Sequence, residues 1–397
     1  MRERLSFQPE AGLDRLLLRN ALLELATLRL YRFWARTDLR RHLWASLKVG
    51  DDALEYTGHG YELFLGFAIA FTVFIPLASL VGNFFVVNTD AVLVTLVFNG
   101  WWLTIMFLTA AGRYSARGYQ LSRTLWRGIC AGQDGSRWAY ASRYMIWSAV
   151  FCVTAGLSVP WACEDLARYR VRHTIWGDRR AQFHGRANQL IRPWLRVWAV
   201  CFGPLYGLCL WQIWQADGNA AALIWGISDL FDLVNRRGDS MNLYGVGVAL
   251  FWVCLTWLYF YAAWLEWLLD QLDIGPLQFS CRSPTGLFRR LFQRMILPAF
   301  FGFAALTLLM HANLHENGPL YRLDYVESVW ACLAVAFIAA IGMGAIWYRF
   351  VVIPLWQEMI ASTTVDNVEA VARTMQSRQP RPRFGEGLWD IGHAHLF

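Results

Sequence analysis

Long uncharged stretches dominate the pattern of hydrophobic and polar positions along this 397-residue chain. A helix rises about 1.5 Å per residue, so roughly 20 apolar residues are needed to cross a bilayer core of about 30 Å. Seven stretches of that length lack aspartate, glutamate, lysine and arginine: 63–89, 91–112, 144–163, 197–216, 240–265, 295–315 and 328–348. The pattern therefore predicts several helices that span a membrane.

Composition agrees with this pattern. The chain is 56% hydrophobic and 16% charged, whereas a soluble domain carries about 25% charged residues. Tryptophan is abundant, with 22 residues, and indole rings are enriched where a membrane meets water. We expect an all-α polytopic membrane protein, in which residues 1–397 form a single integral membrane domain.

The distribution of basic residues predicts which loops face the cytoplasm. One set of segments (35–59, 113–142, 164–189, 269–293 and 350–397) carries 22 arginines and lysines, and the opposite set (83–89, 216–242 and 313–326) carries 3. Short loops rich in these residues stay on the cytoplasmic side. We therefore expect the first set and the tail 366–397 to be cytoplasmic. The expected partner of this basic surface is the bilayer with its anionic headgroups, rather than nucleic acid.

Two segments disturb the alternation of sides. If 144–163 crossed the membrane once, the arginine-rich stretch after it would lie outside. Either this segment is re-entrant, with a turn at Gly156, or the segment 12–34 crosses and one basic loop lies outside. Charged side chains are costly at the centre of a bilayer, so we expect about six full spans, with both segments shallow or re-entrant. Glu24 and Arg29 become functional candidates only if 12–34 is buried, and otherwise form its polar face.

A loop unit recurs along the chain. Residues 39–56 and 121–138 align without a gap at an offset of 82, and weaker copies occur near 168–183 and 268–279. Each unit indicates a basic amphipathic helix, a turn rich in glycine and aspartate, and a short strand. Because a lone strand leaves its backbone unpaired, we expect short strands from several copies to pair in a small cytoplasmic sheet. The aligned pairs are Leu39/Leu121, Arg41/Arg123, Leu43/Leu125, Trp44/Trp126, Gly50/Gly132 and Asp52/Asp134.

Four motifs carry a resemblance to a known family. They are LYRFWARTDLRRHLW at 30–44, LEYTGHGYELFLGF at 54–67, ASTTVDNVEAVA at 361–372 and FGEGLWDIGHAHLF at 384–397. With the repeated middle, the chain resembles the YjgN-like bacterial inner-membrane proteins over essentially its whole length. The resemblance implies a multi-pass protein of the bacterial inner membrane, in a family whose function is uncharacterised. The chain departs from the family at Arg29, where members usually have a glycine.

The candidates for ligand or lipid binding come from the repeated units and from the first clear span. Glu62 stands at the mouth of this span, where its carboxylate is expected to pair with Arg36, Arg40 or Arg41. A ligand-binding or proton-handling role for Glu62 is the alternative. The full set of binding candidates is Arg36, Arg41, Trp44, Tyr56, Glu62, Arg123 and Trp126.

The sequence predicts no metal, cofactor or catalytic site. His311 and His315, one helical turn apart and followed by Glu316, come closest to a metal site. Their order differs from the HExxH motif of zinc enzymes, and no further ligand is evident. No phosphate-binding glycine motif and no nucleophile–base pair can be recognised. We expect a non-enzymatic protein whose arginine-rich cytoplasmic collar engages anionic lipid or a partner protein. A small-solute transporter is the alternative, and an intramembrane enzyme is less favoured.

Overall fold

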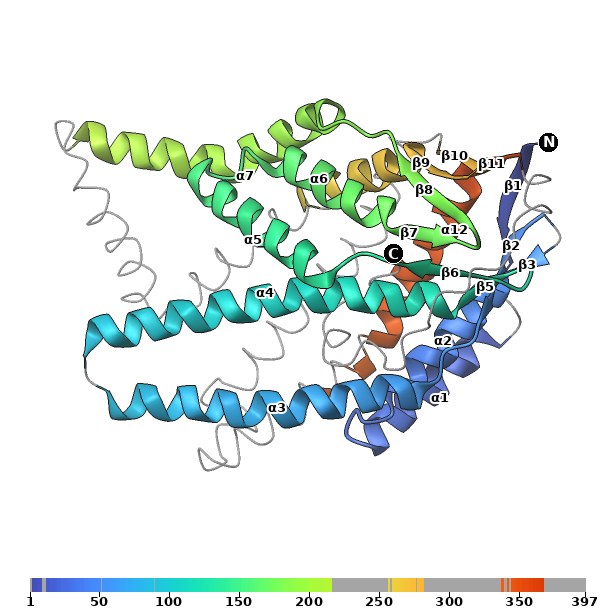
Figure 1. Ribbon diagram of the computed structural model, residues 1–397, viewed down its shortest axis with the longest axis horizontal. Helices are drawn as coiled ribbons and strands as arrows, with labels where there is room; N and C mark the ends of the chain where they lie inside the picture. The colour runs from blue at the N-terminus through green and yellow to red at the C-terminus, as the bar shows by residue number, and fades with distance from the viewer. Residues whose placement is uncertain are drawn as a thin grey trace, which may run out of the picture.

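The computed structural model describes residues 2–8, 12–50, 52–88, 90–215, 256–257, 259–275, 277–281, 337–338, 341–342 and 344–367. Strands gather at one end, and the long helices run away from them (Figure 1). The helices are α1 (Leu13–Ala26), α2 (Arg32–Ser46), α3 (Gly60–Val87), α4 (Ala91–Arg123), α5 (Arg137–Val153), α6 (Val159–Arg172), α7 (Asn188–Gln215), a helical stretch at 259–270, the π-helical turn η1 (Tyr348–Val352) and α12 (Ile353–Ser362).

The strands form one antiparallel sheet of eleven short members, in the order β3-β2-β1-β11-β10-β9-β8-β7-β6-β5-β4. Each is two to six residues long. Their bounds are β1 (Arg2–Phe7), β2 (Leu47–Val49), β3 (Asp52–Ala53), β4 (Glu55–Tyr56), β5 (Thr124–Trp126), β6 (Ile129–Gln133), β7 (Thr174–Trp176), β8 (Arg179–Phe183), β9 (Leu272–Ile274), β10 (Leu277–Cys281) and β11 (Thr363–Asp366).

This sheet closes on itself into a ring. Its first and last members, β3 and β4, are the two halves of one extended segment that flank Leu54. The amide of Leu54 donates to the carbonyl of Leu47, the first residue of β2, and the amide of Thr57 donates to the carbonyl of Arg123, next to β5. The segment therefore pairs with a different neighbour along each half. Closure matters because an open edge would leave backbone groups without partners.

Helix, strand, left-handed turn and second strand recur around the ring. The first strands β2, β5, β7, β9 and β11 follow α2, α4, α6, the stretch 259–270 and α12 in turn. A positive φ, which glycine and asparagine tolerate best, ends each of these strands. At β11 the partner strand is β1, so the ends of the described chain meet in the sheet. The turn residues are Gly50, Gly128, Gly177, Gly275 and Asn367, with φ of 64, 74, 58, 60 and 66°.

The inside of the ring is an apolar core. The third residue of each first strand contributes to one cluster, and Leu54 between β3 and β4, Ala131 of β6 and Leu277 of β10 add to it. The indole rings of Trp126 and Trp176 lie 5.3 Å apart between centroids. The third residues themselves are Val49, Trp126, Trp176, Ile274 and Val365.

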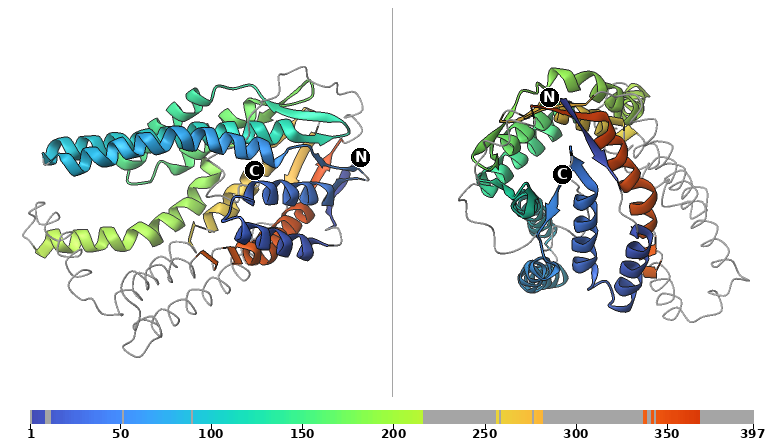
Figure 2. Two further views of the ribbon diagram at one scale, coloured as in Figure 1. Left: turned by 90° about the horizontal axis from the view of Figure 1, so that it is seen from below. Right: turned by 90° about the vertical axis from the view of Figure 1, so that its right-hand side faces the viewer.

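Two helical hairpins flank the long pair α3 and α4. Between α1 and α2 the chain reverses at Leu28 and Arg29, with φ of 49° and 67°. Between α5 and α6 it reverses at Ala155 and Gly156, with φ of 50° and 84°. The expected turn at Gly156 is therefore observed, and 144–163 is two helices. Figure 2 shows α3, α4 and α7 extending well beyond the α1–α2 hairpin.

The predicted all-α fold with about six full spans is wrong. Eleven strands are present among the described residues. Two helices there, α3 and α4, are long and apolar enough to cross a membrane, and no residue of either apolar window is buried. A count of uncharged residues cannot detect a helix break such as the one at Gly156, nor strands of two to six residues. The window 295–315 and most of 240–265 and 328–348 lie outside the described residues.

Pairing between strands of different loop units is confirmed, but in another register. The offset of 82 aligns Trp44 of α2 with Trp126 of β5, one in a helix and the other in a strand. The ring instead places β2, β5 and β7 in equivalent positions, starting at residues 47, 124 and 174. Gly58, Gly135 and Gly185 follow this register, two residues beyond β4, β6 and β8, and a Cβ on any of them would collide with an aromatic ring or its hydroxyl.

Replacing Trp176 by alanine should strongly destabilise the protein. This side chain is 7% exposed in the ring core, and removing a buried tryptophan costs about 3–5 kcal/mol. Thermal unfolding followed by circular dichroism in a fixed detergent measures the loss. Trp138→Ala is the control, since Trp138 on α5 is 47% exposed. Equal melting temperatures for the two variants would contradict a core inside the ring.

Candidate functional site: an arginine pocket

Five of the seven residues proposed from sequence meet where α2, α3 and α4 join the ring. We call this contact, formed by Arg41, Trp44, Tyr56, Glu62 and Arg123, the polar junction. Glu62 accepts hydrogen bonds from Arg123 at 2.6 Å and from the hydroxyl of Tyr119 at 2.5 Å. The side chains of Glu62 and Arg123 are only 22% and 15% exposed. The ion pair is therefore well shielded and fastens the start of α3 to the end of α4.

The other members of the polar junction also bond within the protein. Arg41 donates to the carbonyl of Gly58 at 2.7 Å, and the indole of Trp44 donates to the hydroxyl of Thr124 at 3.0 Å. The rings of Trp44 and Tyr56 lie 5.7 Å apart. These contacts join the first and second units, so their immediate role is to hold the helices on the ring.

The partner of Glu62 corrects the expectation from sequence. The structure pairs it with Arg123 of the second unit, a partner that the sequence did not suggest. The prediction from sequence chose arginines that are close to Glu62 along the chain. Only pairing of β4 with β5 brings the end of α4 beside the start of α3. Of the remaining candidates, Trp126 lies in the ring core, and Arg36 lies in a pocket of its own.

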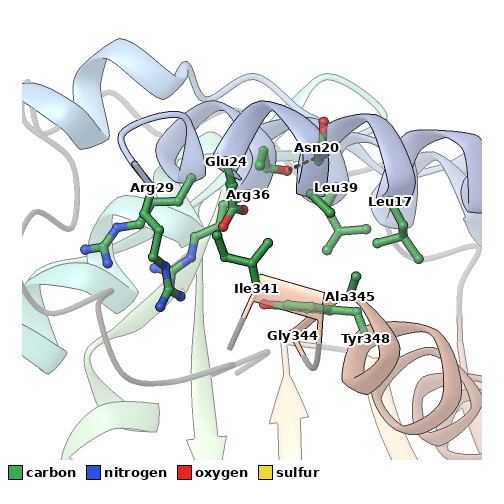
Figure 3. A pocket seen from close by; sticks show the side chains of 13 residues that line it. Leu17, Asn20, Glu24, Arg29, Arg36, Leu39, Ile341, Gly344, Ala345 and Tyr348 are labelled. Carbon is green, nitrogen blue, oxygen red and sulfur yellow. Dashed lines mark hydrogen bonds between the residues drawn. The ribbon is translucent and has the colours of Figure 1, made fainter. Parts of the chain in front are cut away.

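That pocket, the arginine pocket, lies between α1, α2 and the segment leading into η1 (Figure 3). Its volume is about 110 Å³. Three arginines and one glutamate line it, and Figure 3 draws Glu24 and Arg36 next to each other below the α1–α2 hairpin. The lining residues are Leu17, Asn20, Ala21, Glu24, Arg29, Arg32, Ala35, Arg36, Leu39, Ile341, Gly344, Ala345 and Tyr348.

The turn between α1 and α2 builds this site. The hydroxyl of Thr27 donates to the carbonyl of Leu23 and accepts from the amide of Tyr31, which holds the turn in place. The backbone at Arg29 is left-handed, with φ of 67°, a conformation that glycine adopts most readily. The amide of Asn20, 5% exposed, donates to the carbonyl of Ala35 and ties the two helices together.

Spacing brings the three arginines to one side. Arg32 and Arg36 are four residues apart on α2 and share one helical face, and Arg29 precedes them in the turn. The buried Nε of Arg29 has no hydrogen-bond partner among the residues that the structure describes. Burial raises the pKa of Glu24, although the nearby charges of Arg29, Arg36 and Arg32 oppose the shift. The described lining therefore has an excess of two positive charges when Glu24 is ionised.

The arginine pocket adjoins the beginning of a candidate span. The guanidinium of Arg32 lies 5.6 Å from the centre of the Phe67 ring on α3. Phe33 packs against Phe64 and Phe67, with centroid distances of 5.8 and 5.1 Å. Since α3 is uncharged from Leu63 onward, the pocket sits where the polar part of the protein meets its apolar helices.

The charged residues of the arginine pocket differ from the binding candidates that the sequence predicted. Arg36 was among the binding candidates, and Glu24 and Arg29 were conditional ones, but Arg32 was missed. The signal available was the spacing of Arg29, Arg32 and Arg36. His311 and His315 lie outside the described residues. Among the residues that the structure covers, no group of three or more histidines, cysteines or carboxylates could hold a metal.

Comparison with known families supports the resemblance seen in the motifs. Residues 2–391 match a family described as a bacterial protein of unknown function, DUF898. The chain belongs to this family. The expected membership of an uncharacterised bacterial family, covering nearly the whole sequence, is therefore confirmed for this DUF898 member. No curated protein and no solved structure matches it.

Glu62 and Arg123 should be strongly coupled in a double-mutant cycle. Glu62→Gln or Arg123→Gln leaves a shielded charge without its partner, so each is expected to cost about 2 kcal/mol, and the double variant less than their sum. Thermal or chemical unfolding in detergent measures the three values.

The control for this cycle is the pair Asp52 and Arg127, whose side chains are also 2.6 Å apart but 46% and 38% exposed. Exposed pairs contribute at most about 1 kcal/mol. Coupling energies that are equal for the two pairs would contradict a stabilising ion pair between Glu62 and Arg123 at the polar junction.

Proposed function

We propose that this protein is a non-enzymatic, integral component of the bacterial inner membrane, with its strand ring at the cytoplasmic surface and its arginine pocket holding anionic lipid headgroups there. The single observation that carries the proposal is the position of the arginine pocket beside the start of α3. Guanidinium groups placed where apolar helices begin are suited to the phosphates of a bilayer surface.

The surface of α3 and α4 supports the membrane part of the proposal. Large apolar side chains stand open along both helices, among them Val73, Leu80, Val86 and Leu96, and Val86 is 84% exposed. A soluble monomer rarely exposes so much contiguous apolar surface. Lipid chains would cover it, with the connection between α3 and α4 on the side opposite the ring (Figure 1).

The charges support the proposed orientation. Lys48, Arg127, Arg179 and Arg180 lie on or beside strands of the ring. The far turn between α3 and α4 carries Asp90 but no arginine or lysine. Positive charge is retained on the cytoplasmic side, which places the ring there in this proposal.

The lining of the pocket favours binding over catalysis. No serine, cysteine or histidine is among its described residues, so a nucleophile–base pair is not available within that set. Its polar groups are guanidinium donors, one carboxylate, one amide and one phenol. This set is suited to an anion, and it includes Arg36, one of the binding candidates named from the sequence.

The proposal also treats the recurring unit as a degenerate repeat. Val49, Trp126 and Trp176 occupy equivalent inward positions in successive units. Such a repeat explains how one short helix–strand pattern, used several times, builds a ring that a single copy could not.

The sole lysine offers a direct test of sidedness. Lys48 on β2 is the only lysine in the chain, so a membrane-impermeant amine reagent reports the ring in the otherwise unaltered protein. We expect modification of Lys48, identified by peptide mass spectrometry, in inverted membrane vesicles and not in intact spheroplasts.

The matched variant is Asn88→Lys, at the far end of α3. Its new lysine should be modified from spheroplasts only, while Lys48 stays protected there. Labelling of both lysines from the same face would overturn the proposed topology. Release of the protein from vesicles by alkaline carbonate would overturn its integral character.

A further inference from the structure

We propose that the arginine pocket binds the terminal phosphate of a phosphate-monoester lipid, whose acyl chains lie along a leucine stripe on α1. The ligand class is a doubly charged, unsubstituted phosphate carried by a lipid. This inference rests on the proposed function and specifies the headgroup that the pocket selects.

Charge favours a dianion. The described lining supplies three guanidinium groups against one carboxylate, and the buried Nε of Arg29 has no partner in the described part of the chain. A phosphate monoester carries a charge of roughly −1.5 to −2 near neutral pH and offers three strong acceptor oxygens. A phosphodiester carries one negative charge and has two non-bridging oxygens, so it offers this lining less charge and fewer acceptors than a monoester does.

Size favours an unsubstituted phosphate. The cavity has a volume of about 110 Å³, whereas pockets for drug-sized molecules measure about 300–1,000 Å³. A terminal phosphate fits a space of this scale. A headgroup that extends beyond the phosphate with glycerol or a sugar would have to place that extension outside the pocket.

The outer face of α1 favours a lipid over a soluble phosphate. Leu18, Leu22 and Leu25 follow one another at four and three residues, which places them on one face of the helix. Their exposed fractions are 62%, 58% and 37%. Leu28 and Leu30 continue this stripe through the turn, at 77% and 53% exposed.

The same turn therefore presents leucines outward and arginine inward. Arg29, which lines the pocket, lies between the two exposed leucines of the turn. Helices that lie in a membrane interface combine such an apolar face with basic side chains. Acyl chains on the stripe would leave the phosphate within reach of the pocket, and the neighbouring start of α3 continues the apolar surface.

The experiment measures lipid binding to the purified full-length protein in detergent by native mass spectrometry. The probes are dioleoyl phosphatidic acid, dioleoyl phosphatidylglycerol and dioleoyl phosphatidylcholine. We expect phosphatidic acid to bind at least about tenfold more tightly than phosphatidylglycerol, a factor equal to 1.4 kcal/mol. Equal affinity for these two lipids would overturn the monoester assignment.

Substitutions locate the site. Arg29→Gln should weaken phosphatidic acid binding about tenfold or more, since charge-assisted bonds to phosphate are lost. Arg127→Gln, the same change on an exposed ring residue, should leave binding within about twofold. Glu24→Gln should strengthen binding because it removes the only carboxylate of the described lining. An equal loss for Arg29→Gln and Arg127→Gln would overturn the pocket as the site.

Two further measurements distinguish a lipid ligand from a soluble anion. Leu22→Ser should weaken phosphatidic acid binding, whereas Leu157→Ser, at another exposed leucine between α5 and α6, should not. Glycerol 3-phosphate should fail to compete at concentrations where phosphatidic acid is bound. If glycerol 3-phosphate competes effectively and Leu22→Ser leaves phosphatidic acid binding unchanged, the lipid assignment is overturned. The ligand of the pocket is then a soluble phosphate.

This outcome is distinguishable from failure of the proposed function. Labelling of Lys48 and the Asn88→Lys variant tests the topology in membranes, whereas the lipid arms use protein in detergent. Correct sidedness with no preference for phosphatidic acid would overturn the headgroup and leave the membrane proposal intact.

Discussion

Antiparallel backbone pairing in a closed ring is the constraint on which the described architecture depends. Strands of two to six residues are too short to persist alone, and a single hairpin is marginal in water. Each unit supplies two such strands, and its neighbours supply their partners. Two pairings complete the circle. The segment around Leu54 pairs with β2 through β3 and with β5 through β4, and β1 pairs with β11. Distant parts of the chain become neighbours only when the whole circle is complete.

Ring closure also determines the order in which the helices attach to the ring. Each first strand follows directly on a helix, so the order of strands sets the order of helices around the ring. The pairing of β4 with β5 places the end of α4 beside the start of α3, where Glu62 meets Arg123. A shielded ion pair of this kind is weak evidence for net stability, since both groups lose water. Its clear effect is geometric, because it holds the two apolar helices together at one end.

The arginine pocket follows from the same arrangement. The α1–α2 hairpin leaves the ring through β1 and returns to it through β2, so its turn lies away from the strands and against the first turns of α3. Arg29, Arg32 and Arg36 thereby come to one side of a small cavity beside apolar rings. The unpartnered Nε of Arg29 and the raised pKa of Glu24 have one physical origin, which is the burial of charged groups away from bulk solvent.

The sequence by itself determined the apolar character of α3 and α4, the family, the turn at Gly156 and the presence of strands in the recurring loops. These features rest on local composition, on glycine and on motifs that are contiguous in the chain. Only the tertiary structure decided the closed ring, the register that aligns β2 with β5, the partner of Glu62 and the pocket around Arg29. The reason is that strands this short and ion pairs between units depend on partners tens to hundreds of residues away, which local periodicity cannot specify.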